Sequence, residues 1–198
     1  MTSTVSRKAA WEGLKRLSQD HVTPNHSVAD IFPWGILKTV GSRDPKEDRA
    51  HAIIASSVVE QALVFASLKR FPREDTDVLD QLFEGNGAPL SSFDASIRIA
   101  YSLGIIGKDT RDDLSSIRRI RNAFAHTRIK IDFDREEIRN ACSQISLPQR
   151  WPEMGVDPSD AREVYLQSCF QYSLFLLTED DGRGDAIKGA SSVQLMRT

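Results

Sequence analysis

The chain has 198 residues, of which 40% are hydrophobic and 27% are charged, and its formal net charge is −2. These values are typical of one globular domain with its own core, and they exclude a generally basic nucleic-acid-binding protein. No apolar run approaches the roughly 20 residues that a membrane-spanning helix requires, and the N-terminus lacks the apolar segment of a signal peptide. Cys142 and Cys169 lie in helical apolar patterns, so we expect reduced core cysteines in a cytoplasmic protein.

The first predicted elements are an N-terminal arm and a long helix. Residues 1–43 combine a short amphipathic helix with an irregular stretch, and we expect an arm there. Asp44, Pro45 and Glu47 have the pattern of an N-cap, a proline at the first helical position and a capping box. Apolar residues then recur at intervals of three and four until Phe71, which predicts the central core helix.

Two shorter helices are predicted next. One covers residues 75–83, and Gly85 ends it. Ser91 with Asp94 marks the start of another, which Gly104 ends as a C-terminal glycine. The predicted core face of this second helix consists of Phe93, Ile97, Ala100, Tyr101 and Leu103.

A further helix is predicted over residues 109–125, where Asp109 and Asp112 form its N-terminal signal. A short helix is expected to start at Asp134 and to run toward Ile145. The predicted core face of the longer one consists of Leu114, Ile117, Ile120 and Phe124.

The C-terminal part of the sequence predicts a loop, a last helix and a tail. We expect residues 148–152, which are bounded by prolines, to form the loop. We expect Asp157 and Asp160 to mark the start of a helix that runs to about Leu177. Residues 179–198 are small and polar, which favours a flexible tail. The predicted core face of the helix consists of Val164, Leu166, Phe170, Leu174 and Leu177.

Together these elements predict an all-α fold. We expect a single-domain bundle of about six to seven helices over residues 44–178, because no segment shows the sustained alternation of a strand.

The most informative stretch is the hexapeptide from Arg121 to His126. Two residues five positions apart differ by about 500° around a helix axis, which is about 140° beyond one full turn. Arg121 and His126 would therefore converge only if the helix ended or bent between them. A guanidinium matches phosphate geometry and an imidazole can transfer a proton near neutral pH, so the pair could bind or cut a phosphodiester without a metal.

Basic residues surround this hexapeptide. Arg118, Arg119, Arg128 and Lys130 lie within nine positions of Arg121. One interpretation is a solvated helix face, whose C-terminal end also favours cations through the helix dipole. The alternative is a small cationic cleft for a phosphate-bearing ligand or a nucleic acid.

Other kinds of site find little support in the sequence. None of the four histidines lies at zinc-binding spacing from another ligand, and no glycine-rich phosphate loop is present, so we expect neither a metal nor a cofactor. Residues 96–120 have the outline of a helix-turn-helix. Its second helix, however, would carry Asp109, Asp112 and Asp113 at the end that contacts bases, which argues against DNA reading by this unit.

Several motifs in this order resemble the mannitol operon repressor (MltR) family over about residues 48–145. The matching motifs are Asp48-Arg49, Ala55-Ser56, Glu60-Gln-Ala-Leu63, Leu82-Phe-Glu-Gly85, Pro89-Leu-Ser-Ser-Phe93, Arg98-Ile-Ala-Tyr-Ser-Leu-Gly104, Ile117-Arg-Arg-Ile-Arg-Asn-Ala-Phe-Ala-His126, Phe133, Ile138 and Cys142. The resemblance implies an all-helical regulatory protein without a recognisable DNA-binding motif.

The hexapeptide also resembles the Arg-x4-6-His signature of HEPN domains, many of which are metal-independent ribonucleases that act as dimers. This resemblance implies that Arg121 stabilises the scissile phosphate, that His126 is the general acid or base, and that Asn122 assists.

Three hypotheses follow for the function. The first is an MltR-like transcriptional (co)repressor, a cytoplasmic homodimer that acts through a protein partner or a modest basic surface on DNA or RNA. The second is a HEPN-type ribonuclease that uses Arg121 and His126. The third is that these residues are structural and that Arg121 caps or bridges helices.

Overall fold

The computed structural model describes residues 44–71, 76–83 and 87–178. The predicted arm (1–43), the predicted tail (179–198) and the glycine stop at Gly85 lie outside these residues. The described residues form an all-helical single domain without strands. Its helices are α4 (Asp48–Leu68), α5 (Thr76–Phe83), α6 (Phe93–Ser102), α7 (Lys108–His126), α8 (Glu136–Cys142), α9 (Leu147–Arg150), a 3-10 helix η1 (Pro152–Met154) and α10 (Ala161–Thr178).

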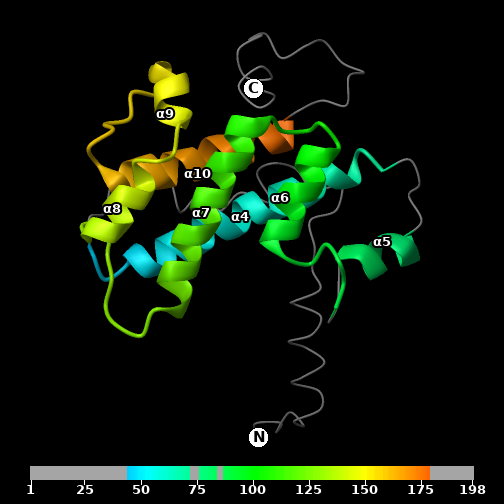
Figure 1. The fold of residues 1–198 in the computed structure, drawn as a ribbon, viewed down its shortest axis with the longest axis horizontal. Helices are drawn as coiled ribbons and strands as arrows, with labels where there is room; N and C mark the ends of the chain where they lie inside the picture. Colours follow the sequence, from blue (N-terminus) through cyan, green and yellow to red (C-terminus); the bar gives the residue numbers. More distant parts are fainter. Residues whose placement is uncertain (1–43, 72–75, 84–86, 179–198) are drawn as a thin grey trace, which may run out of the picture.

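Helix α4 is the centre of the bundle, as predicted. It packs against α10, α7 and α6, while α8 and α9 lie at one end of the molecule and α5 at the other (Figure 1). By length and composition alone α4 could cross a membrane, but 61% of its apolar window is buried inside the domain. This is the pattern of a core helix in a bundle, and it is weak support for a membrane segment.

Helices α4 and α10 run in the same direction. Asp48 in the first turn of α4 contacts Arg162 in the first turn of α10, and the Tyr165 hydroxyl donates to the carbonyl of Ala52 (3.1 Å). The predicted core face of α10 is only partly right, because Phe170 and Leu174 are half-buried. The side chains that the prediction missed are fully or almost fully buried: Tyr165, Tyr172, Phe175 and Leu176.

Two helices start later than predicted. Asp44 accepts from the backbone N–H of Lys46 (2.9 Å) in a turn, and α4 begins only at Asp48. Asp157 likewise accepts from Ser159 in a turn before α10. In both cases the Asp-Pro pair forms a turn of its own before the helix, and for α10 it is Asp160 that accepts from a first-turn N–H.

The start of α6 also differs from the prediction. Ser92, not Ser91, caps α6, and it accepts from Ala95 N–H (3.2 Å). The predicted glycine at its end is confirmed, because Gly104 has a φ of +69°, a conformation that favours glycine. Tyr101, which the apolar pattern assigned to the core, is exposed and lies under the Arg111 guanidinium.

The predicted starts of α7 and α8 are also wrong by one or two residues. α7 begins at Lys108 after Gly107, and α8 begins at Glu136; neither has a side-chain cap. The predicted core face of α7 is confirmed, since its four apolar residues are all buried. The predicted loop at residues 148–152 is instead mostly helical, formed by α9 and the start of η1.

Candidate functional site

The hexapeptide lies in the last two turns of α7, and the helix continues through His126. The chain leaves the helix only at Thr127, which has extended backbone angles. The break that would bring Arg121 and His126 together is therefore absent from α7, and the two side chains leave the helix about 140° apart. His126 is exposed, whereas Arg121 is half-buried toward α4.

Arg121 links α7 to the central helix. Its Nη2 lies 3.7 Å from Oε2 of Glu60 on α4, and its Nη1 donates to Oδ1 of Asn122 (3.2 Å). The Nε atom of Arg121 is buried and has no hydrogen-bond partner among the described residues. Burial raises the pKa of the Glu60 carboxyl, and the nearby Arg121 charge partly offsets this effect. The contact to Glu60 fits a helix-bridging role for Arg121.

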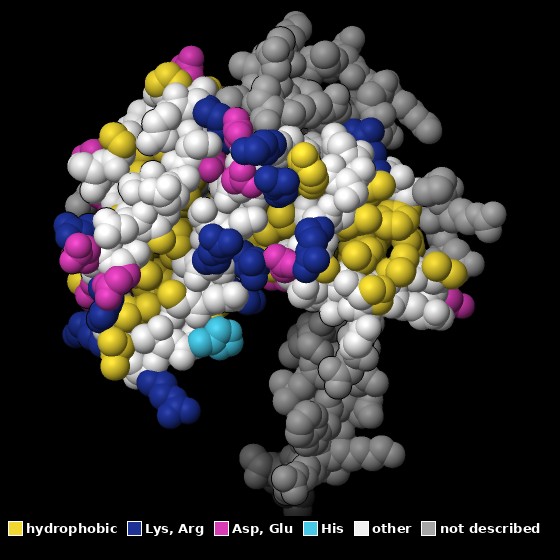
Figure 2. Space-filling model, viewed as in Figure 1, with side chains coloured by type: hydrophobic (Ala, Val, Ile, Leu, Met, Phe, Trp, Pro, Cys, Tyr) yellow, Lys and Arg dark blue, Asp and Glu magenta, His cyan; other side chains and the backbone are white. Residues whose placement is uncertain are grey.

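The other predicted cations fall into two groups. Arg118 is paired, because its Nη2 lies 3.1 Å from Oδ1 of Asp94 on α6, which also pairs with Arg98. Arg119 on α7, together with Arg128 and Lys130 in the loop that follows, is exposed and makes no ion pair with any described residue. Figure 2 shows basic side chains spread over the α6–α7 face, with acidic side chains between some of them.

The loop after α7 is held by residues to which sequence reasoning assigned no role. The Arg49 guanidinium donates to the carbonyls of Thr127 (3.0 Å) and Ile129 (2.9 Å), and Asp48 accepts from the backbone N–H of Phe133 (3.1 Å). The Phe133 ring packs against two buried aromatic rings of α7 and α10. The first turn of α4 therefore fixes both ends of the basic loop.

Asp48 is also part of a buried ion pair. Its Oδ1 accepts from Nε of Arg162 (3.0 Å), and Nη2 of Arg162 lies 3.0 Å from Nδ1 of His51. Because a guanidinium can only donate, this contact requires an unprotonated Nδ1 on His51. The group connects residues more than 100 positions apart in the chain.

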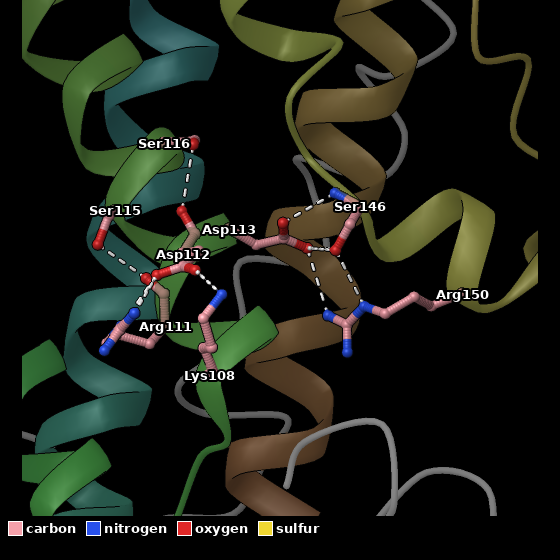
Figure 3. A network of polar contacts seen from close by, with 8 residues as sticks. All are labelled: Lys108, Arg111, Asp112, Asp113, Ser115, Ser116, Ser146 and Arg150. Atoms are coloured by element: carbon pink, nitrogen blue, oxygen red, sulfur yellow. Dashed lines mark hydrogen bonds and ion pairs between the residues drawn. The ribbon is translucent and has the colours of Figure 1, made fainter. Parts of the chain in front are cut away.

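A second buried group surrounds Asp113 of α7 (Figure 3). Its carboxylate accepts from the backbone N–H groups of Ser146 (2.8 Å) and Leu147 (2.9 Å), from the Tyr172 hydroxyl (2.6 Å) and from the Arg150 guanidinium (3.3 Å). Burial, together with the Asp113 charge, raises the pKa of Tyr172 well above its usual value. Asp113 therefore joins α7 to α9 and α10.

This arrangement bears on DNA reading by the α6–α7 pair. At the N-terminal end of α7, Asp113 points into the core and Asp112 bonds Lys108 (3.1 Å) and Arg111 (2.7 Å). A helix that inserted this end into the major groove would bring Asp109 and Asp112 toward phosphates. That α7 is not a recognition helix stays a prediction.

The cysteine prediction is confirmed: Cys142 and Cys169 are buried free thiols. Burial raises the pKa of the Cys142 thiol to about 12, so neither geometry nor protonation favours nucleophilic chemistry there. Within the described part of the chain, no group of three or more His, Cys, Asp or Glu side chains is placed to hold a metal ion.

A scan against protein-family models matches residues 45–180 to the mannitol repressor family, abbreviated MtlR. The match covers more than two thirds of the chain. The chain belongs to the mannitol repressor family. No curated protein matches the chain, and no solved structure does.

Membership in the mannitol repressor family indicates a role in transcriptional regulation. The family match extends past the motifs noted in the sequence and includes α10. It thus contains both buried ionic groups, and the Asp48-Arg49 motif now has a physical role as the anchor of the loop after α7.

Proposed function

We propose that this mannitol repressor family member is a cytoplasmic transcriptional corepressor that acts through a partner protein and does not read DNA bases itself. The observation that supports this proposal is the N-terminal end of α7, which places the half-buried Asp109 and the exposed Asp112 where base contacts would be required. The net charge of −2 supports the same conclusion, because tight DNA binding by the isolated chain would require a larger basic surface.

Two measurements test this proposal together. Deleting the gene should change a small set of transcripts, and chromatin immunoprecipitation of the full chain should recover discrete loci. Selection from a random duplex library by the purified chain should enrich no sequence, because the partner supplies base recognition. A tight, sequence-specific complex of the isolated chain at physiological salt would contradict the partner-dependent mechanism, and unchanged transcripts would contradict a regulatory role.

The homodimer is a separate proposal. Soluble oligomers are most often two-fold symmetric, and a regulator that meets a partner on DNA gains avidity from two copies. Light scattering of the full chain at micromolar concentration should give a mass of twice 22.2 kDa. A monomer under these conditions would refute it.

The ribonuclease hypothesis concerns Arg121 and His126. A metal-independent nuclease of this kind needs Arg121 and His126 at one phosphate, and on the continuous helix α7 they diverge. We therefore expect the purified chain to leave a mixed RNA pool intact in the presence of a chelator. Cleavage that His126→Ala abolishes without unfolding the protein would restore the ribonuclease hypothesis in place of ours.

A further inference from the structure

Four cationic or protonatable side chains on the second half of α7 and in the loop after it have no acidic partner among the described residues. We call Arg119, His126, Arg128 and Lys130 the free-cation patch. All four are exposed, and none makes an ion pair with a described residue. Three other exposed cations differ from the patch in this respect: Arg98 pairs with Asp94, Lys108 with Asp112 and Arg135 with Glu137.

Two members of the patch share one ridge of α7. Arg119 and His126 are seven residues apart, so they lie about 20° apart around the helix axis and about 10 Å apart along it. This ridge faces away from the core, because the buried positions of α7 lie on its opposite side. His126 ends the helix, and the chain continues directly into the loop that carries Arg128 and Lys130.

The loop part of the patch is held in place before any ligand arrives. The two carbonyls that flank Arg128, those of Thr127 and Ile129, both accept from the Arg49 guanidinium. The Asp48 carboxylate fixes the end of the loop through the Phe133 N–H. A loop fixed in this way loses less conformational entropy on binding than a free one does.

We propose that the free-cation patch binds the phosphate backbone of nucleic acid, without sequence preference. This goes beyond the proposed function, in which the partner supplies base recognition and no DNA contact is assigned to this chain. Unpaired arginine and lysine side chains gain most from phosphates, because no carboxylate has to be displaced first. A membrane surface fits less well, because only Ile129, which is 55% exposed, would enter the lipid next to the loop cations.

The test is a fluorescence anisotropy titration of the full chain against a labelled duplex. The probe is a duplex of about 20 base pairs. For three phosphate contacts, a plot of the logarithm of the binding constant against the logarithm of the salt concentration should have a slope of about −2.7. The affinity should therefore fall by about 40-fold between 50 and 200 mM salt. Replacing Arg119, Arg128 and Lys130 by alanine should remove this binding. A parallel titration with an RNA duplex shows which nucleic acid supplies the phosphates.

A control variant changes the global charge by the same amount. Arg98→Ala, Lys108→Ala and Arg135→Ala together remove three exposed cations that already have carboxylate partners. This variant should keep its affinity within about twofold, since each removed cation already contacts a carboxylate that weakens its attraction for phosphate. An equal loss of DNA affinity in both triple variants would show that only net charge matters, and would overturn the proposal.

Two further arms complete the test. Arg49→Lys keeps the charge but loses the two-carbonyl contact, so it should weaken DNA binding, whereas a purely structural Arg49 would change only the melting temperature. Vesicles that contain phosphatidylserine should not bind through the patch. The proposal would be refuted by vesicle binding that depends on the patch without DNA binding, or by the absence of DNA binding at 50 mM salt. The transcript measurements test the proposed function independently.

Discussion

Two neighbouring aspartates on α7 have opposite environments. Asp113 is 2% exposed and accepts from groups on two other helices, α9 with its N-cap Ser146 and α10. The side chain of Asp112 is 48% exposed and pairs, among the described residues, with Lys108 and Arg111 on its own helix (Figure 3). The amino acid is the same, and a rotation of about 100° around the helix separates its two roles.

The same contrast holds for whole regions of the molecule. The buried ionic groups around Asp48 and Asp113 join segments 33 to 114 positions apart, so they fix the tertiary arrangement. The ridge and loop at the end of α7 carry cations that the described fold does not use. The charges buried between helices therefore specify the fold, and those left unpaired outside it are available for binding.

The largest expected effect follows from removing Asp113. Asp113→Ala would leave the Arg150 charge and two N–H groups without their buried acceptor, at a cost of about 3–5 kcal/mol. For a chain of this size, that lowers the melting temperature by on the order of 10 °C. Asp112→Ala is the matched control and should cost below about 0.5 kcal/mol. Equal melting temperatures for the two variants in thermal denaturation would contradict the assigned roles.

The next effect distinguishes a charged from a neutral acceptor. Tyr172→Phe removes a hydroxyl that donates to the Asp113 carboxylate, and should cost about 1.5–3 kcal/mol. Tyr165→Phe removes an equally buried hydroxyl that donates to the neutral carbonyl of Ala52, and should cost about 1 kcal/mol. Urea denaturation of both variants measures the difference, and a larger loss for Tyr165→Phe would contradict a charge-assisted bond at Tyr172.

Helical periodicity predicted α4 and α7 well. Both helices pack against several neighbours yet keep one solvent face, so apolar and polar positions separate cleanly around each axis. The helix end at Gly104 was also predicted correctly. A residue in the left-handed conformation after a helix is usually glycine, so the sequence shows this position directly.

The same reasoning failed where tertiary contacts decide the outcome. None of the described α10 side chains is exposed, so its sequence carries little periodic signal, and Tyr165 and Tyr172 were missed as core residues. Asp113 was interpreted as part of a surface acidic run, because nothing in the local sequence reveals hydrogen-bond donors 33 to 59 positions away. Helix starts were misplaced where an Asp-Pro turn preceded the helix.

A smaller effect separates the two ends of the hexapeptide. Arg121→Ala removes the link to Glu60 and should cost about 1 kcal/mol, because both side chains are partly exposed to solvent. His126→Ala should leave the melting temperature unchanged, since His126 is exposed and makes no hydrogen bond or ion pair with a described residue. Thermal melts of the two variants measure the difference. A marked loss for His126→Ala would show that the imidazole has a structural role.

The smallest effect concerns the pH dependence of stability at Glu60. Burial raises the pKa of this carboxyl in the folded state, so the folded protein holds its proton more tightly than the unfolded chain does. The resulting stability is fully present below the usual glutamate pKa and is lost as the pH rises through the folded-state value. Glu60→Gln cannot ionise, so its stability relative to the original chain should increase from pH 4 to pH 7 in urea denaturation. A relative stability that decreases over this range would show that the Arg121 charge, rather than burial, dominates at Glu60.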